Sequence, residues 1–145
     1  MTNPTSAPSL DQPYYGAPLK EAVRRFFQKY ATFTGRASRS EFWWWILVAA
    51  IVNFVLNLLA SIGGFALKPN GEFEIGGFAV FVLIVAGLWG LATIVPQIAL
   101  TVRRLHDTNR SGFWYFIVLI PLIGSIVLLV FLLLDSDPQG ARFDR

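Results

Sequence analysis

The side chains best suited to chemistry lie in one short stretch, residues 103–114, which reads RRLHDTNRSGFW. Within eight successive positions it holds three arginines, the only histidine of the chain and one aspartate, namely Arg103, Arg104, Arg110, His106 and Asp107. On both sides the sequence is apolar over lengths that could cross a bilayer, and charge beside hydrocarbon is costly. These side chains must therefore form ion pairs, contact water or have a functional role, and they form the first candidate site.

Acid–base catalysis is the sharpest chemistry that this stretch could support. His106 and Asp107 are neighbours in sequence and resemble half of an acid–base pair. The chain has no cysteine, and no serine or second histidine completes a recognisable triad. A single histidine with scattered carboxylates also gives no metal-ligand spacing. We therefore predict no catalytic or metal-binding residue and no cofactor, and we keep as an alternative a membrane enzyme that acts on lipid phosphate through these two residues.

The composition predicts an integral membrane protein. Of the 145 residues, 54% are hydrophobic and only 14% are charged, against about 25% charged in soluble domains. The apolar residues come in three long blocks, which a soluble core of this size could not bury. The net charge of +3 could suggest nucleic-acid binding, but the basic residues flank the apolar blocks, as the positive-inside rule describes. We therefore expect a membrane-bound chain with no nucleic-acid partner.

The chain before the first apolar block divides into two parts. Residues 1–18 hold four prolines and several small polar residues without apolar periodicity, which predicts a disordered tail. Residues 19–33 place apolar and basic side chains on opposite faces at helical spacing. This pattern predicts an amphipathic helix that lies in the membrane interface, with packing on a partner domain as the alternative.

The three apolar blocks predict an all-α fold in which three transmembrane helices follow the interfacial helix, at about 42–67, 75–102 and 113–134. A turn-rich loop, 68–74, joins the first two, and a polar tail, 135–145, follows the last. Pro121 predicts a kink in the third span, and a re-entrant hairpin that folds at this proline is the alternative.

The distribution of lysine and arginine gives the expected orientation. Six lie between residue 20 and the first span, one in the first loop, three in the second loop and two in the tail. The positive-inside rule puts both strongly basic segments in the cytoplasm, so that the N-terminus is cytoplasmic and residues 68–74 lie outside. Three crossings would then leave the C-terminus outside.

This orientation brings a second arginine-containing segment, residues 35–45, to the same face of the membrane as residues 103–114. Ser38 and Glu41 have the spacing of a capping box, in which each side chain binds a backbone N–H at a helix start. The polar residues before the third span have turn and N-cap chemistry; these are Asp107, Thr108, Asn109 and Ser111.

The two segments together form the predicted cluster, which either binds anions or is a structural network of ion pairs. Its members are Arg36, Arg39, Glu41, Arg103, Arg104, His106, Asp107 and Arg110. If Glu41 and Asp107 each pair with one arginine, about three cations remain near the headgroups, where a guanidinium suits phosphate. The alternative is that the arginines only extend to the interface and set the topology.

Two motifs in these segments resemble the signatures of a family of small bacterial inner-membrane proteins, domain of unknown function 805 (DUF805). They are residues 33–43 (FTGRASRSEFW) and residues 103–108 (RRLHDT) with 110–114 (RSGFW). An Ile-Pro-x-x-Gly element that ends at Gly124 follows them, whereas the ending departs from the family, with alanine and aspartate at 141 and 144. The resemblance covers about residues 20–145 and implies a bacterial inner membrane location, and the family has no established activity.

We therefore predict a small, non-enzymatic inner membrane protein, multi-pass with a cytoplasmic N-terminus, whose arginine cluster binds anionic lipid headgroups or a protein partner. Membrane lipids are the expected partners, and a homo-oligomer or another membrane protein is a further one. An alternative is a subunit of an oligomeric transporter or channel, with a polar path lined by Asn53, Asn57, Gln97 and His106.

Overall fold

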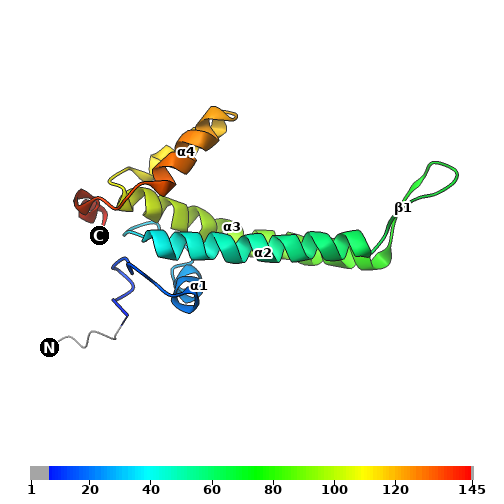
Figure 1. Cartoon of the computed structure of the whole chain (residues 1–145), viewed down its shortest axis with the longest axis horizontal. Helices are drawn as coiled ribbons and strands as arrows, with labels where there is room; N and C mark the ends of the chain where they lie inside the picture. The colour runs from blue at the N-terminus through cyan, green and yellow to red at the C-terminus, as the bar shows by residue number, and fades with distance from the viewer. Residues whose placement is uncertain (1–6, 145) are drawn as a thin grey trace. The chain divides into compact units, whose positions relative to one another are not determined.

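The computed structural model describes residues 7–144, and the described chain is mostly helical. Its elements are α1 (Leu19–Gln28), α2 (Arg39–Ile62), β1 (Phe65–Leu67), β2 (Phe73–Ile75), α3 (Gly77–Asp107), the 3₁₀ helix η1 (Gly112–Leu119), α4 (Ile123–Leu133) and the 3₁₀ helix η2 (Pro138–Phe143) (Figure 1). They form two compact units. Residues 46–94 make up the hairpin unit, and the described residues before and after them make up the core unit.

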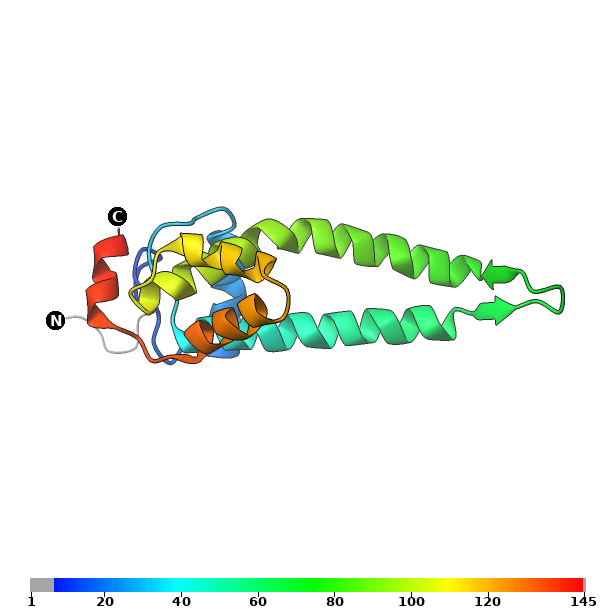
Figure 2. The same ribbon diagram turned by 90° about the horizontal axis from the view of Figure 1, so that it is seen from above.

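The hairpin unit consists of one arm from α2 and one from α3, joined by an antiparallel two-stranded ribbon (Figure 2). The ribbon pairs Phe65 with Ile75, so the expected loop is in part a β-hairpin and the first span ends at Ile62, not near residue 67. The helix ends there because of the glycine pair Gly63 and Gly64. Gly64 has φ +93°, which ends the helix, and a Cβ at Gly63 would lie only 2.7 Å from the backbone nitrogen of Ala79.

Helices α2 and α3 are long and apolar enough to cross a membrane. At a rise of 1.5 Å per residue, their 24 and 31 residues reach about 36 and 46 Å, more than the ~30 Å of a hydrocarbon core. Only 11% of the apolar 18-residue stretch within each helix is buried, and Phe54 and Leu91 are about 70% exposed. The core helix of a soluble protein would be covered, so this exposure supports contact with lipid.

The third apolar block is not the single kinked helix that we expected over 113–134. It forms η1 and α4, two short helices that contact one another across a turn at residues 120–122. Pro121 lacks an N–H, and Leu122 adopts φ +61°, so the helix cannot continue through the turn. A Cβ at Gly124 would lie 1.7 Å from the carbonyl oxygen of Ile117, so only glycine permits the close return. The local geometry is that of the hairpin alternative.

Helix α1 ends at Gln28, five residues before the end that its pattern predicts, and it buries a different face. Phe26 is buried and stacks on Trp45, with ring centroids 3.4 Å apart. Arg25 and Lys29, which we placed on the solvated face, are 2% and 4% exposed. The contacts that compensate the burial of Arg25 come from residues distant in sequence, among them Glu41.

Both tails form hydrogen bonds to other segments of the core unit. Among the residues expected to be disordered, Tyr14 and Ala17 donate backbone hydrogen bonds to Glu41 and Ser40, while residues 1–6 lie outside the described chain. At the other end, Gly35 N–H donates to the carbonyl of Phe143 over 2.8 Å. The C-terminal tail therefore lies at the same end as residues 35–45. Three full crossings would put these two segments on opposite sides of a membrane, and this hydrogen bond does not fit that expectation.

Candidate functional site

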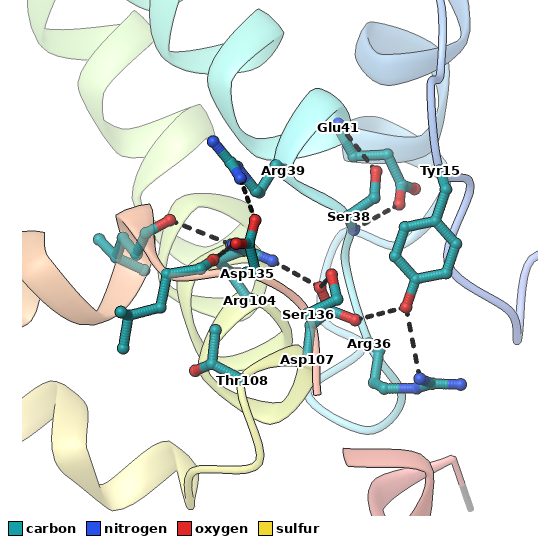
Figure 3. Close-up of polar contacts among 12 residues, drawn as sticks. Tyr15, Arg36, Ser38, Arg39, Glu41, Arg104, Asp107, Thr108, Asp135 and Ser136 are labelled. Atoms are coloured by element: carbon teal, nitrogen blue, oxygen red, sulfur yellow. Dashed lines mark hydrogen bonds and ion pairs between the residues drawn. The ribbon is translucent and has the colours of Figure 1, made fainter. Parts of the chain in front are cut away.

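The start of α2 is fixed by the capping box that the sequence predicts. The hydroxyl of Ser38 accepts a hydrogen bond from Glu41 N–H at 3.2 Å, and Ser38 N–H donates to Oε2 of Glu41 at 2.9 Å (Figure 3). These two bonds satisfy donors that the first turn of a helix leaves unpaired. They also fix the Glu41 carboxylate, which is 3% exposed, inside the core unit.

Glu41 pairs with an arginine that the predicted cluster did not contain. Nη1 of Arg25 lies 3.3 Å from Oε1 of Glu41, and both side chains are at least 96% buried. Arg25 also donates to the carbonyls of Pro8, Ser9 and Gln12. Because most of its donors reach acceptors, burial of this charge is compensated. The N-terminal segment thereby becomes part of the site.

Asp107 is the centre of a second buried network (Figure 3). Its carboxylate accepts hydrogen bonds from Nη1 of Arg104 at 2.5 Å, from the Ser136 hydroxyl at 2.5 Å and from the Tyr15 phenol at 2.7 Å. The side chains of Arg104 and Asp107 are both 0% exposed. Arg104 also donates to two backbone carbonyls at the end of α4, those of Leu132 and Leu134. Asp107 therefore holds three segments together, and our prediction that it caps the third span is wrong.

The neighbouring polar residues end one helix and begin the next. Asn109 has φ +60°, and the N–H of Arg110 returns to the Leu105 carbonyl at 2.9 Å, which closes α3. Thr108 donates its hydroxyl to the same Leu105 carbonyl. Ser111 alone has the predicted capping role, because its hydroxyl accepts from Phe113 N–H at 3.4 Å. Helix α3 consequently runs to Asp107, beyond the expected end at residue 102.

His106 belongs to a different network from Asp107. Its Nδ1 lies 3.0 Å from the carbonyl oxygen of Gly35, and its ring stacks on Phe143 with centroids 4.2 Å apart. Because a carbonyl only accepts, Nδ1 carries the proton and donates it to Gly35. Within residues 7–144, no hydrogen bond joins His106 to Asp107. The two residues of the alternative acid–base pair are adjacent in sequence but contact two different sets of partners.

The C-terminal tail neutralises two of the arginines that we expected to be in surplus. Arg36 forks onto the Asp144 carboxylate, with contacts of 2.7 to 3.1 Å that raise the pKa of the guanidinium. Arg39 pairs with Asp135, although both of these side chains are exposed. Arg110 lies 4.3 Å from the centroid of the Phe131 ring. We predicted only a polar tail for residues 135–145 and no partners for these carboxylates.

Two buried cations, Lys29 and Arg103, have no ion-pair partner among the described residues, and Nε of Arg25 also lacks a hydrogen-bond acceptor there. Nζ of Lys29 and Nη2 of Arg103 are enclosed, and neither has a hydrogen-bond partner in the described part of the chain. Among the described residues, the Arg103 side chain donates through Nε alone, to the Ala99 carbonyl at 3.2 Å. Burial, together with the charge of Arg103, lowers the pKa of Lys29 from 10.5 to about 8. Of these two cations, Arg103 belongs to the predicted cluster and Lys29 lies outside it.

Two cavities adjoin these networks. The first has a volume of about 290 Å³, and its wall includes Lys29, Thr32 and Thr34 together with the carboxylate residues Asp11 and Asp144. The second, of about 350 Å³, is mostly apolar and has His106 in its wall. Thr34 lines both. The segment between α1 and α2 therefore separates a charged cavity from an apolar one.

Comparison with known proteins gives the family of the chain. The family described as "Protein of unknown function (DUF805)" matches residues 30–145. The chain belongs to the DUF805 family. It is 36% identical to inner membrane protein YhaI of Escherichia coli K12 over 80% of this chain and 86% of that protein. It is also 36% identical to inner membrane protein YhaH of the same strain over 82% and 89% of the two chains.

A more distant relative in the same strain, the uncharacterized protein YiiR, is 34% identical over 61% of this chain and half of its own length. No solved structure matches the chain. The DUF805 match and the two exposed apolar helices agree with the membrane class that the composition predicts. The matched region begins after α1, so Arg25 and Lys29 lie outside it.

Proposed function

We propose that this DUF805 protein is a non-enzymatic, multi-pass inner membrane protein that binds an anionic lipid headgroup at its cytoplasmic end. The binding residues are Lys29 and Arg103, which we call the anion site. The observation that carries this function is that Nζ of Lys29 and Nη2 of Arg103 are both enclosed and lack acceptors among the described residues.

Energetics favour an anionic ligand at these two groups. An unsatisfied buried donor costs about 1–3 kcal/mol, and more when it is charged. Three cations, Arg25, Lys29 and Arg103, interact electrostatically here with Glu41, which Arg25 already engages, and Lys29 also interacts with Asp11. A phosphate group would supply both the missing acceptors and the missing charge.

The adjoining cavity indicates the kind of headgroup. Lys29 and two threonines lie in the same wall as Asp11 and Asp144, so the cavity presents both signs of charge. A phosphodiester would be held on the cationic side, and hydroxyl or ammonium donors beyond the phosphate would meet the carboxylates. A choline group offers no such donor, which favours phosphatidylglycerol over phosphatidylcholine.

In this proposal the arginines of the predicted cluster have mainly structural roles. Arg104, Arg36 and Arg39 pair with Asp107, Asp144 and Asp135. Only Arg103 contributes to the anion site. Headgroup binding therefore depends on one member of the predicted cluster and on a lysine from α1.

The membrane arrangement that goes with this function has two full crossings and one re-entrant hairpin. Helices α2 and α3 provide the crossings. The eight residues of η1 and the eleven of α4 each extend about 16 Å, half of a ~30 Å hydrocarbon core, and their apolar side chains are largely exposed. The N-terminal segment, residues 103–114 and the C-terminal tail then share the cytoplasmic face.

The alternative functions receive less support. A lipid-phosphate enzyme needs His106 and Asp107 to act together, and they contact different partners. In a polar transport path, Asn57 would be available to a solute, but its amide donates to the Asn53 carbonyl of its own helix. Gln97, another residue of that path, accepts a 2.6 Å hydrogen bond from the Trp45 indole, so its side-chain oxygen is already engaged.

The test compares two double variants that remove the same charge. Lys29→Met with Arg103→Met empties the anion site, whereas Lys20→Met with Arg24→Met removes two exposed cations of α1. The readout is the rise in unfolding temperature that dioctanoyl phosphatidylglycerol produces in detergent, with dioctanoyl phosphatidylcholine as reference. We expect the phosphatidylglycerol effect in wild type and in the exposed variant, and its loss in the buried one. An equal effect in all three proteins contradicts the proposal.

A further inference from the structure

The apolar cavity beside His106 has the composition of a ligand pocket. Its volume is about 350 Å³, in the range of small-molecule sites. Its walls come from the 33–34 segment, α3 and η1, and include Phe33, Ile98, Val102, Phe113 and Phe116. None of the described lining residues is a lysine, arginine, aspartate or glutamate. An ionic ligand would find no partner there.

The polar lining residues of this pocket are Thr34, Ser111, Tyr115 and His106, and His106 contributes its second ring nitrogen. Nδ1 is occupied by the Gly35 carbonyl, so Nε2 is the nitrogen that can meet a ligand. Nε2 lies on the side of Gly112, since a Cβ at Gly112 would be 3.5 Å from it, and both residues line the pocket. The same Cβ would lie 2.6 Å from Cγ1 of Val102, so glycine is required at this point of the wall.

The histidine presents an acceptor. With the proton on Nδ1, the neutral imidazole has a lone pair on Nε2. The ring stacks on Phe143, and Arg142 places its guanidinium 4.7 Å from the centroid of the same Phe143 ring. Within the described chain, no carboxylate forms a hydrogen bond with this imidazole. A charged imidazolium would thus face the nearby Arg142, while the carboxylate that acts on it, Asp144, is already paired with Arg36.

We propose that this pocket binds a neutral membrane-borne amphiphile with one hydroxyl group, whose O–H donates to Nε2 of His106 while its hydrocarbon body packs on the aromatic wall. The pocket adjoins apolar elements: α3 is a candidate membrane span, and Phe113 and Phe116 of η1 are 80% and 58% exposed. A ligand dissolved in the bilayer can therefore reach it. This inference does not depend on the anion site.

The experiment uses the fact that the chain has one histidine. Protein labelled with ¹⁵N-histidine, in nanodiscs of phosphatidylcholine, gives one pair of ring nitrogen signals. The probe is 1-decanol, and decane, which has the same chain without the hydroxyl, is the matched control. We expect a saturable shift of the Nε2 signal with decanol, in the direction of an accepted hydrogen bond, and no such shift with decane.

Two variants locate the effect. Val102→Phe fills the pocket, whereas Val118→Phe adds the same bulk to η1 at a residue outside the pocket lining. We expect the decanol shift to be lost in the first and kept in the second, and Ile98→Phe replaces Val102→Phe if that variant does not fold. A shift that rises without saturation, or that survives both pocket-filling substitutions, overturns the proposal. An Nε2 signal that shows a protonated nitrogen at pH 7 also overturns it.

Discussion

The phenol of Tyr15 donates a 2.7 Å hydrogen bond to Oδ1 of Asp107, across 92 residues of sequence (Figure 3). This bond joins the N-terminal segment to the end of α3. The opposite oxygen, Oδ2, takes Arg104 and Ser136. One buried carboxylate thus links the N-terminal segment, α3 and the C-terminal tail.

Removing this phenol tests the link. Tyr15→Phe leaves the ring but deletes a hydrogen bond to a charged acceptor, worth about 1.5–3 kcal/mol. Because Arg104 and Ser136 still engage Asp107, we expect a loss of stability near the lower end of that range. The free energy of unfolding in detergent gives the measurement. Tyr115→Phe, for which no side-chain hydrogen bond is described, is the control and should change it little.

Replacing Asp107 should lower the free energy of unfolding far more than replacing an exposed aspartate that also pairs with an arginine. Asp107→Asn leaves Arg104 charged and 0% exposed, and loss of one partner from a buried pair costs about 3–5 kcal/mol. Asp135→Asn breaks the Arg39 pair, whose side chains are 51% and 91% exposed, and should cost at most about 1 kcal/mol. Denaturant unfolding of both variants, side by side, measures the difference. Similar losses would show that burial does not set the strength of these pairs.

Local signals in the sequence predicted the parts of the site that are fixed by local geometry. The spacing of Ser38 and Glu41 predicts the capping box, and both bonds are present. Hydrophobic length predicts α2 and α3, although their ends moved by several residues. Pro121 and Gly124 were the sequence signal for the hairpin. Hydropathy reports only the length of an apolar stretch, so it does not distinguish a turn at Pro121 from a kink.

The long-range partners could not be predicted in this way. The pattern of α1 puts Arg25 and Lys29 on a polar face, and only the fold shows that Glu41 approaches this face. Asp144 stands where the resembling family has glycine, so the motif gave no reason to pair it with Arg36. Such pairs join residues far apart in sequence, and neither periodicity nor spacing reports on them.

Lys29 should make stability depend on pH in the alkaline range. Its pKa is about 8 in the folded protein and 10.5 in the unfolded chain, so the unfolded state binds more protons between these values. Stability should therefore rise with pH from about 8, by up to about 1.4 kcal/mol per pH unit. Burial and the bond to Asp107 raise the pKa of Tyr15, which acts in the opposite sense above pH 10. Unfolding is best followed between pH 7 and 9.5.

Two comparisons assign this pH effect to Lys29. Lys29→Met should remove the rise, whereas Lys20→Met, at an exposed position of the same helix, should keep it. Saturating dioctanoyl phosphatidylglycerol should flatten the rise in wild type, because a bound phosphate stabilises the charged amine. A rise that persists in Lys29→Met would show that another group titrates.

The re-entrant hairpin predicts where the C-terminus lies. The chain contains no cysteine, so single cysteines at positions 20, 70 and 141 can be labelled without background. Asp137 N–H donates to the Asp107 carbonyl at 2.8 Å, which holds the tail beside the end of α3 that follows the second crossing. We therefore expect Lys20→Cys and Ala141→Cys to react with a membrane-impermeant maleimide only in inverted vesicles, and Asn70→Cys only in intact spheroplasts. A third full crossing would instead make position 141 react like position 70, and the hairpin arrangement would then be excluded.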